Sequence, residues 1–281
     1  MDLQLSPEHE MVRQMVRDFA QREVAPIIKD ADRQQAMAPT ILPRMGELGI
    51  LGVCLPVRYG GQGMDYVALG LVCEELEAVD TTLRVVMSVH VGLNSLGLLQ
   101  WGTEEQKRKF LAPQARGEKI AAFGLTEPGV GSDVAGMLSS ARRKGDGYIL
   151  NGEKTWISLA TKADHVLWFA KTDSNSADPH DGISAFILET DRPGVTRGDL
   201  HGKLGVRAGS TGWLHCSDVE VPADQRLGEE GEASASPCPA STTGATPWPP
   251  GRRGSSAPAS RPACVTPRSG VPSAAPSPVS S

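Results

Sequence analysis

Residues 122–133 of the chain read Ala-Phe-Gly-Leu-Thr-Glu-Pro-Gly-Val-Gly-Ser-Asp. The apolar run 120–125 predicts a strand, whereas the Pro and Gly residues after it cannot continue a regular element, so the stretch must end as a loop. Such a loop exposes backbone N–H groups and the hydroxyls of Thr126 and Ser132. Those groups suit the polar edge of a heterocycle or a pyrophosphate.

A second segment, 151–158, reads Asn-Gly-Glu-Lys-Thr-Trp-Ile-Ser. Asn-Gly is a hairpin turn signal, so Trp156 and Ser158 offer an aromatic plane and a hydroxyl just beyond a turn. Taken alone, Trp156 could be a core aromatic of the hairpin, and Thr126 and Ser132 could be turn hydroxyls that cap their own loop. A dinucleotide-binding fingerprint is excluded at 129–134, because Val134 stands where the third glycine belongs and no βαβ pattern surrounds it.

Residues 1–118 carry the period of α-helices. Ser6-Pro7-Glu8 offers an N-cap, a proline in the first turn and an early acidic residue. Apolar residues then recur at helical spacing, and we expect Pro26 to stop this helix. Further helices are expected over 39–48, after the glycine-rich stretch 59–63, over 83–99, and from the capping box at 103–106. We therefore predict an all-α domain over residues 1–118.

Beyond residue 118 the pattern changes to short apolar runs separated by turn signals. Asp146-Gly147, Asn151-Gly152 and Asp181-Gly182 are signals of this kind. We predict an antiparallel β domain over 119–226, folded as a barrel or a sandwich. Because a block of helices precedes a block of strands, the predicted class is α+β with separate domains: an all-α N-terminal domain, a β-barrel middle domain and a tail.

The end of the chain differs in composition from the rest. Beyond Glu232 it has no Asp, Glu or Lys and four Arg, at positions 252, 253, 261 and 268. From Ala233 onward it also lacks Leu, Ile, Phe and Tyr, so it cannot offset its ordering entropy. We predict a low-complexity disordered tail over 227–281. Residues 1–232 carry 24 basic and 33 acidic residues, a balance that argues against a nucleic-acid partner or an anionic membrane.

Neither the cysteines nor the first residues point to secretion. The five cysteines form no CxxC pair, so we expect no disulfide framework and no metal site, and a reducing compartment is the simpler interpretation. The first ten residues have neither the basic stretch nor the apolar core of a signal peptide. No apolar run approaches the roughly 18 residues of a membrane span. We expect a cytoplasmic protein with no membrane span.

Together, the segments 122–133 and 151–158 resemble the signature of the acyl-CoA dehydrogenase family. That signature is approximately Phe/Tyr-x-Leu/Val-Thr-Glu-Pro-x-x-Gly-Ser-Asp, followed by Asn-Gly-x-Lys-x-Trp-Ile-Ser/Thr. Both strings occur here in order, at the expected spacing and after a helical region. Further matches extend the resemblance over residues 1–232, at 22–26, 56–61, 101–106, 203–207 and 218–222.

The resemblance implies a helical domain, a β-barrel domain and a second helical bundle, with FAD between barrel and bundle. Family members remove the α-proton of an acyl-CoA substrate with a carboxylate base and pass a hydride from the β-carbon to flavin N5. The electrons go to an electron-transfer flavoprotein, and the intact family forms homo-oligomers. Negative charge gathers on the flavin's pyrimidine edge on reduction, so N–H and O–H donors are needed there.

By the resemblance, the cofactor-binding residues are Phe123, Gly124, Leu125, Thr126, Glu127, Gly131 and Ser132 of the first segment and Trp156, Ile157 and Ser158 of the second. Phe123, Leu125 and Thr126 would lie along the isoalloxazine, Trp156 beside the ring and Ser158 near N5. Ser132 matches a residue at the boundary between cofactor and substrate. In addition, residues 83–88 resemble the segment with which glutaryl-CoA dehydrogenases hold the distal carboxylate of their substrate. Arg84 and Ser88 would then bind substrate; the alternative is an arginine that covers a helix surface.

After residue 232 the sequence departs from the family. Ala-Ser-Ala-Ser-Pro stands where the family has Gly-Phe and a helix, so we expect the third domain and its catalytic glutamate to be absent, and we assign no catalytic residue. A positioned general base is worth about 10²–10⁴ in rate, so the chain as given is expected to be inactive or nearly so. Our hypothesis for the tail is a frameshift in GC-rich DNA. Two alternatives stay open: a non-catalytic two-domain binding module, and a relative of the acyl-CoA oxidases.

Overall fold

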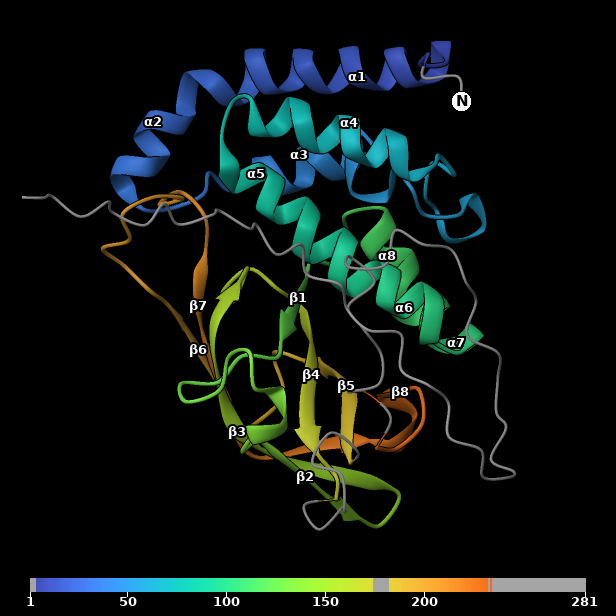
Figure 1. The fold of residues 1–281 in the computed structure, drawn as a ribbon, viewed down its shortest axis with the longest axis vertical. Coiled ribbons are helices and arrows are strands. Elements are labelled where there is room, and N and C mark those ends of the chain that lie inside the picture. Colours follow the sequence, from blue (N-terminus) through green and yellow to red (C-terminus); the bar gives the residue numbers. More distant parts are fainter. Residues whose placement is uncertain (1–3, 174–181, 232, 234–281) are drawn as a thin grey trace, which may run out of the picture. The chain divides into compact units, whose positions relative to one another are not determined.

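The computed structural model describes residues 4–173, 182–231 and 233. Its N-terminal part is helical (Figure 1). The α-helices are α1 (Pro7–Phe19), α2 (Ala25–Gln34), α3 (Ile41–Glu47), α4 (Tyr66–Glu77), α5 (Thr81–Val86), α6 (Leu96–Trp101), α7 (Glu104–Gln106) and α8 (Ala112–Ala115). Three π-helical stretches join some of them: η1 (Ala20–Val24), η4 (Met87–Ser95) and η5 (Lys107–Leu111). Residues 81–101 and 104–115 are therefore continuous helices.

Local signals set where several helices begin. The hydroxyl of Ser6 accepts a hydrogen bond from the His9 N–H at 3.3 Å, and Pro7 opens the first turn of α1. At α7, the Thr103 hydroxyl and the Gln106 side chain form a reciprocal capping box. Both helix starts confirm the sequence prediction. The caps stabilise these starts because they satisfy N–H groups that lack an intrahelical partner.

Pro26 does not stop the helical path, contrary to our expectation. The helix α1 ends at Phe19, the π-helical turn η1 follows, and α2 begins at Ala25 with Pro26 in its first turn. A proline is tolerated there because the N–H groups of a first turn have no acceptor within the helix. The helix α2 ends instead at Gln35, whose φ of 54° is left-handed.

The strands that follow form one sheet. They are β1 (Ala121–Gly124), β2 (Ser140–Lys144), β3 (Gly147–Ser158), β4 (His165–Lys171), β5 (Ile183–Glu189), β6 (Val195–Asp199), β7 (Thr211–Pro222) and β8 (Arg226–Leu227). Their order is β6-β7-β3-β2-β4-β5-β8, and β1 lies off this path as a partner of β4 (Figure 1).

This sheet corrects the prediction of an antiparallel barrel. β1 pairs with β4 in parallel, and so does β2 through Ser140 and Lys171, so the sheet is mixed. The path ends at β6 and β8, which do not pair with each other, so the sheet is not closed into a barrel. Hydrophobic alternation shows that a strand has a buried face, but it carries no information on the direction of the neighbouring strand.

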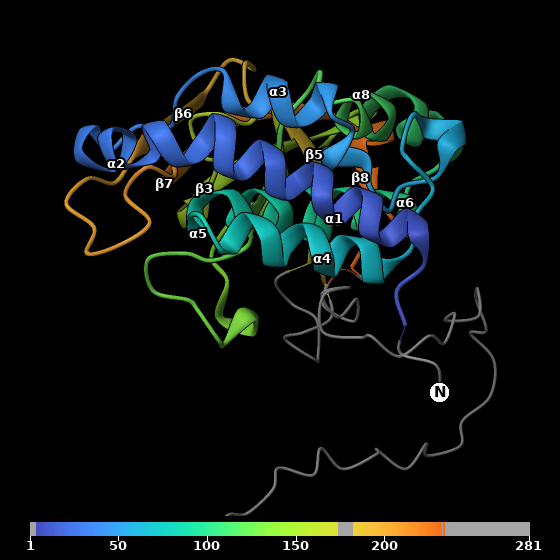
Figure 2. The ribbon, with the colours of Figure 1, turned by 90° about the horizontal axis from the view of Figure 1, so that it is seen from above.

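Helices and sheet share a hydrophobic core. One cluster of buried side chains runs from Val16 and Phe19 in α1 to Leu150 in β3 and Trp168 in β4. Seen from above, α1 runs between α3 and α4 (Figure 2). Arg17 of α1 donates to the buried carboxylate of Glu75 in α4 at 2.6 Å and 2.8 Å, which ties these two helices together.

The continuous helix Thr81–Trp101 is long and apolar enough to cross a membrane by length and composition. This helix corrects our expectation that no apolar run approaches the length of a membrane span. However, 61% of its most apolar window is buried inside the protein, and its apolar residues Leu83, Val86 and Val91 belong to the core. We therefore interpret it as a core helix.

The first residues of the predicted tail belong to the fold. Leu227 lies in β8 and pairs with Ala185 of β5. Gly231 donates to the Ser184 hydroxyl at 2.8 Å, and the Ala233 N–H donates to the Ile183 carbonyl at 2.8 Å. The rest of the predicted tail, 234–281, lies outside the described residues.

Candidate functional site

The loop predicted within the segment 122–133 begins at the end of the strand β1. Gly124 is buried in it, and a Cβ there would lie 3.0 Å from Val166 Cγ1 of β4, so glycine permits the close approach of the two strands. Phe123 is half-buried and packs against Phe169, with ring centroids 5.0 Å apart. The end of β1, Phe123 and Gly124, is thus set against β4 before the chain turns into the loop.

A buried ion pair between Lys154 and Glu127 holds the loop in place. Lys154 Nζ of β3 donates to Glu127 Oε1 at 2.7 Å, and the two side chains are 0% and 4% exposed. Glu127 also accepts the backbone N–H groups of Leu138 and Ser139, at 2.7 Å and 2.9 Å. The pair therefore joins the beginning of the loop, its end and β3.

Burial and pairing have opposite effects on the pKa values of both groups in this ion pair. Burial raises the pKa of the Glu127 carboxyl, but the hydrogen bonds from Lys154, Ser139 and Leu138 outweigh it and leave this pKa below its ordinary value. Burial lowers the pKa of Lys154 to about 8, against the attraction of Glu127. Both groups are charged at neutral pH. Because its carboxylate faces inward, Glu127 holds the loop together rather than facing a ligand.

Lys154 also orients the backbone of the loop. Its Nζ donates to the Leu125 carbonyl at 3.1 Å, and the Thr126 carbonyl accepts the Thr155 N–H at 2.9 Å. A trans peptide places its C=O and N–H on opposite sides. Since the Leu125 carbonyl faces the buried lysine, the Thr126 N–H is directed away from it. Lys154 was not among the predicted site residues, although it lies inside the motif 151–158, because a lysine there reads as a surface residue.

Trp156 stands out on β3. It lies at an irregularity in the pairing of β3 with β7, between the pairs Thr155–Trp213 and Ile157–Gly212. Its φ is 58° and its side chain is 65% exposed, while the next residue, Ile157, is 2% exposed. A large aromatic residue in the left-handed region is strained, and a bulge re-aims the side chain that it carries. Trp156 is therefore not a core aromatic of the hairpin.

The loop has free hydroxyl groups. Within the described part of the chain, the hydroxyls of Thr126, Ser132 and Ser158 make no hydrogen bond. Gly131 and Ser132 are exposed, and a Cβ on Gly131 would meet nothing within 4 Å. The available groups are thus donors, the N–H and hydroxyls, with an exposed indole nearby in sequence and no outward carboxylate from Glu127.

Arg84 and Ser88 are brought together by α5 and η4. Arg84 Nη1 donates to Ser88 Oγ at 3.1 Å, while Arg84 Nε donates to Glu77 Oε2 at 2.9 Å. The guanidinium is therefore already paired with a carboxylate, as expected for an arginine that covers a helix surface. Among the described residues, no hydrogen bond or ion pair joins Arg84 or Ser88 to the loop or to Trp156.

A second polar cluster, which the sequence reading did not identify, lies beside β1. Its members are fully or almost fully buried and come from η4, α8 and β4: His90, Asn94, Ser95, Gln114 and His165. Burial lowers the pKa of both His90 and His165 to about 4, so both rings are neutral at pH 7. Polar residues at helical spacing inside the apolar run 83–99 were the available signal.

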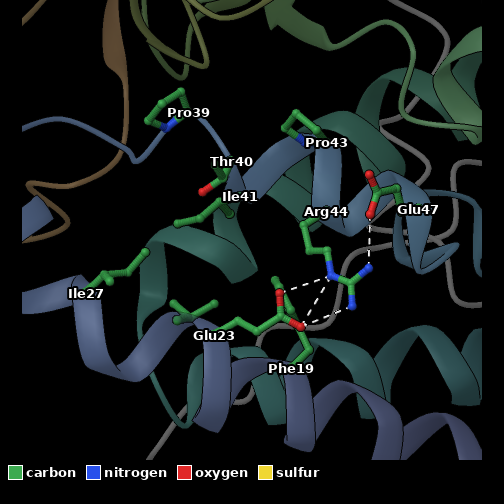
Figure 3. Close-up of a pocket in the computed structure, with 10 residues that line it drawn as sticks. Phe19, Glu23, Ile27, Pro39, Thr40, Ile41, Pro43, Arg44 and Glu47 are labelled. Atoms are coloured by element: carbon green, nitrogen blue, oxygen red, sulfur yellow. Dashed lines mark hydrogen bonds and ion pairs between the residues drawn. The ribbon is translucent and has the colours of Figure 1, made fainter.

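A groove lies elsewhere, between α1, η1 and α2 on one side and α3 on the other (Figure 3). Its volume is about 360 Å³, and Phe19, Ile27 and Ile41 contribute apolar lining. Arg44 of α3 spans it by an ion pair to Glu23 of η1 at 3.0 Å and also pairs with Glu47 of its own helix at 3.0 Å. None of the predicted site residues lines it. In the described residues no group of three or more His, Cys, Asp or Glu side chains could hold a metal ion.

The described residues thus combine a helical part with a mixed sheet that carries a donor-rich loop after one of its strands. Comparison with known protein families identifies the family of this chain. Residues 6–118 match the acyl-CoA dehydrogenase N-terminal domain, and residues 122–219 match the acyl-CoA dehydrogenase middle domain. The chain belongs to the acyl-CoA dehydrogenase family, of which it carries these two domains.

Individual relatives and solved structures agree with this family assignment. The short-chain specific acyl-CoA dehydrogenase of Clostridium acetobutylicum is 41% identical over 83% of this chain and 61% of its own length. Butyryl-CoA dehydrogenase from Megasphaera elsdenii has a TM-score of 0.80 at 36% identity, over 84% of this chain and 62% of that one. Glutaryl-CoA dehydrogenase from Mycobacterium smegmatis, solved in complex with FADH2, has a TM-score of 0.76 at 37% identity, over 82% and 58%. The chain thus spans about three fifths of the length of these relatives.

Proposed function

We propose that residues 121–158 form the protein's share of an FAD site. The observation that carries this proposal is the loop after β1: Lys154 holds the Leu125 carbonyl on its inner side, so the Thr126 N–H is directed outward, and the hydroxyls of Thr126, Ser132 and Ser158 are free in the described part of the chain. Donors that the inward-facing carboxylate of Glu127 does not oppose fit the edge of a flavin on which negative charge accumulates.

The roles of the individual residues follow from their surroundings. Phe123, Gly124 and Leu125 set the strand along which the ring system would lie, and the Thr126 N–H and hydroxyl would donate to its edge. The exposed indole of Trp156 would pack beside the ring, with Ile157 anchoring the bulge in the core and Ser158 donating next to it. Gly131 and Ser132 would lie at the far end of the loop, toward the substrate. Glu127 would act only through Lys154 and the loop backbone.

The reaction proposed for the whole protein is α,β-dehydrogenation of an acyl-CoA thioester, with electrons passed to an electron-transfer flavoprotein. Bound FAD would accept the hydride that leaves the β-carbon of the acyl group. This chain's residues would hold the flavin and supply donors to its reduced form. A short acyl group is the proposed substrate, since the relative that is 41% identical is short-chain specific.

Arg84 and Ser88 support a second candidate, an acyl group with a distal carboxylate, because they form a hydrogen-bonded pair at 3.1 Å. The ion pair between Arg84 and Glu77 at 2.9 Å disfavours it, since a substrate carboxylate would have to displace Glu77. Reaction of the whole protein with butyryl-CoA and glutaryl-CoA would separate the two. We expect butyryl-CoA to be preferred, and preference for glutaryl-CoA would reverse this assignment.

For residues 1–281 alone we propose weak flavin binding and little or no turnover. The chain spans about three fifths of the length of its relatives, and by the resemblance the general base lies outside the two matched domains. A cytoplasmic location and homo-oligomerisation belong to the same proposal. A non-catalytic binding module built on these two domains is the alternative, and it would bind a protein partner without flavin.

Titration of the purified chain with FAD, followed by flavin fluorescence, tests the proposal. We expect saturable binding and substoichiometric flavin after purification. Trp156→Leu and Ser158→Ala should weaken binding, whereas Leu204→Ala, which removes an exposed apolar side chain outside the site, should not. Absence of saturable binding would refute the FAD site. A stable flavin spectrum that bleaches with butyryl-CoA would refute the proposed inactivity.

A further inference from the structure

The start of the strand β1 is bonded to side chains of a helix as well as to a neighbouring strand. Its first edge pairs with β4 in parallel. On the edge away from β4, the Ala121 N–H donates to His90 Nδ1 at 3.0 Å, while Asn94 Nδ2 donates at 2.7 Å to the carbonyl of the next residue, Ala122, which faces β4. Both side chains come from η4. One N–H and one C=O of the strand are thus satisfied by a helix of the N-terminal part.

The two side chains, which we call the η4 clamp (His90 and Asn94), are held in place by further bonds. His90 and Asn94 are 0% and 1% exposed. His90 Nε2 lies 3.2 Å from the Gln114 carbonyl, and Gln114 Nε2 donates to Asn94 Oδ1 at 2.9 Å. Because Nδ1 accepts from Ala121, the ring proton is assigned to Nε2, which donates to Gln114. Each polar group of the clamp therefore has a partner, as a buried polar network requires.

The π-helical geometry of η4 accompanies this contact. Ser95 Oγ lies 2.7 Å from the carbonyl oxygen of His90, five residues earlier, and 2.6 Å from Gln114 Oε1, so its one O–H proton has two acceptors within reach. π-Helical turns are rare and occur frequently at functional sites. Here the π turn lies where the helix meets the strand that leads to the loop.

The clamp lies next to the proposed flavin contacts. Ala122 is followed directly by Phe123, and an extended chain rises by about 3.3 Å per residue, so Thr126, two residues beyond the end of β1, lies only a short way along the chain. Beyond Ala122, the Lys154 and Thr155 bonds of β3 hold the Leu125 and Thr126 carbonyls. Loss of the clamp would remove the bonds between the start of β1 and η4 and leave β1 held there by β4 alone, so the strand would be free to shift or tilt.

We propose that His90 and Asn94 are positioning residues for the flavin: they fix β1 against η4, so that the donors after it keep the place in which they meet the cofactor. This inference rests on the proposed FAD site. Neither side chain need touch the flavin, and both act through the backbone of β1.

The experiment compares FAD affinity and amide hydrogen exchange in the full chain and four variants. His90→Leu and Asn94→Leu remove one clamp bond each and should weaken FAD binding about ten-fold or more, as expected for an unsatisfied buried group. They should also shift the absorption bands of bound flavin. His90→Asn should restore most of the affinity lost in His90→Leu, because Asn Oδ1 can accept the Ala121 N–H.

Glu75→Gln is the matched control. Glu75 is buried and paired with Arg13 and Arg17, and among the described residues no hydrogen bond or ion pair joins it to β1, so this variant loses stability without loss of the clamp. Its FAD affinity should stay within about two-fold of the unchanged chain, since distant sites act independently. The inference is overturned if the Leu variants bind FAD as Glu75→Gln does, or if His90→Asn is no better than His90→Leu.

Amide exchange separates this inference from the proposed function. A chain that binds no FAD in any form refutes the FAD site and the flavin role of the clamp. The clamp itself is then decided by exchange at residues 121–125. Faster exchange there in the Leu variants and not in Glu75→Gln supports it, and unchanged exchange overturns it.

Discussion

Replacing Lys154 with Met tests whether the buried ion pair holds the loop. The lysine is 0% exposed and donates to Glu127 at 2.7 Å and to the Leu125 carbonyl at 3.1 Å. Met fills a similar length but removes the charge and both bonds. Glu127 keeps the N–H groups of Leu138 and Ser139 but loses its counterion. Leaving one buried charge uncompensated costs about 3–5 kcal/mol, a large part of a typical stability of about 5–15 kcal/mol.

Two further variants check that burial sets this magnitude. Lys144 and Glu220 form an equally short ion pair, 2.6 Å, but their side chains are 59% and 70% exposed. Lys144→Met should therefore cost only about 0–1 kcal/mol. The double variant Glu127→Gln/Lys154→Met removes both buried charges and leaves an amide oxygen for one of the two N–H groups. It should be clearly more stable than Lys154→Met alone.

Urea unfolding at pH 7, followed by circular dichroism, gives the free energy of unfolding of each variant. A loss below about 1 kcal/mol in Lys154→Met would show that the pair is not needed to hold the loop. The reasoning would also be wrong if the double variant were no more stable than the single one.

Three other outcomes are expected. Burial holds the pKa of His90 and of His165 at about 4, below the ordinary 6.5, so the unfolded chain takes up protons first as the pH falls from 6.5 toward 4. Stability should drop by about 2 kcal/mol per histidine between pH 7 and pH 5, and urea unfolding of His90→Asn should show a shallower drop. Trp156→Asn should change stability by under about 1 kcal/mol, because asparagine tolerates a left-handed φ, yet weaken FAD binding; unchanged affinity would remove Trp156 from the site. Gly212→Ala should destabilise by roughly 2 kcal/mol or more, since the new Cβ would lie 2.0 Å from the Gly198 carbonyl oxygen; a thermal unfolding midpoint equal to that of the unchanged chain would contradict this.

The sequence predicted those features that depend on local chemistry. Ser6 and Thr103 cap their helices as expected because a cap needs only residues within one turn. The segment 122–133 leaves its strand as a loop since Pro128 and its glycines exclude other structures. The family also follows from two short strings of residues, and comparison confirms it.

Features that depend on distant partners could not be predicted. The parallel pairing of Ala121 with His165 joins segments whose own patterns do not specify direction. Lys154 reads as a surface residue until its partner Glu127 is known to be buried. In the same way, the polar residues His90 and Asn94 read as interruptions of an apolar helix, and only their bonds to β1 explain them.

The parallel pairing of β1 with β4 has a consequence for the order of folding. The residues of β4 that pair with β1, His165–Trp168, follow the whole β2–β3 hairpin in the chain. β1 therefore cannot pair until this later segment has been synthesised. Pairing between distant segments slows folding, because the entropy of closing the loop must be met before the contact forms. Until then the apolar residues of β1 are exposed to other chains, a common origin of aggregation during synthesis. The loop proposed to hold FAD therefore reaches its native conformation only after the ribosome has passed Trp168.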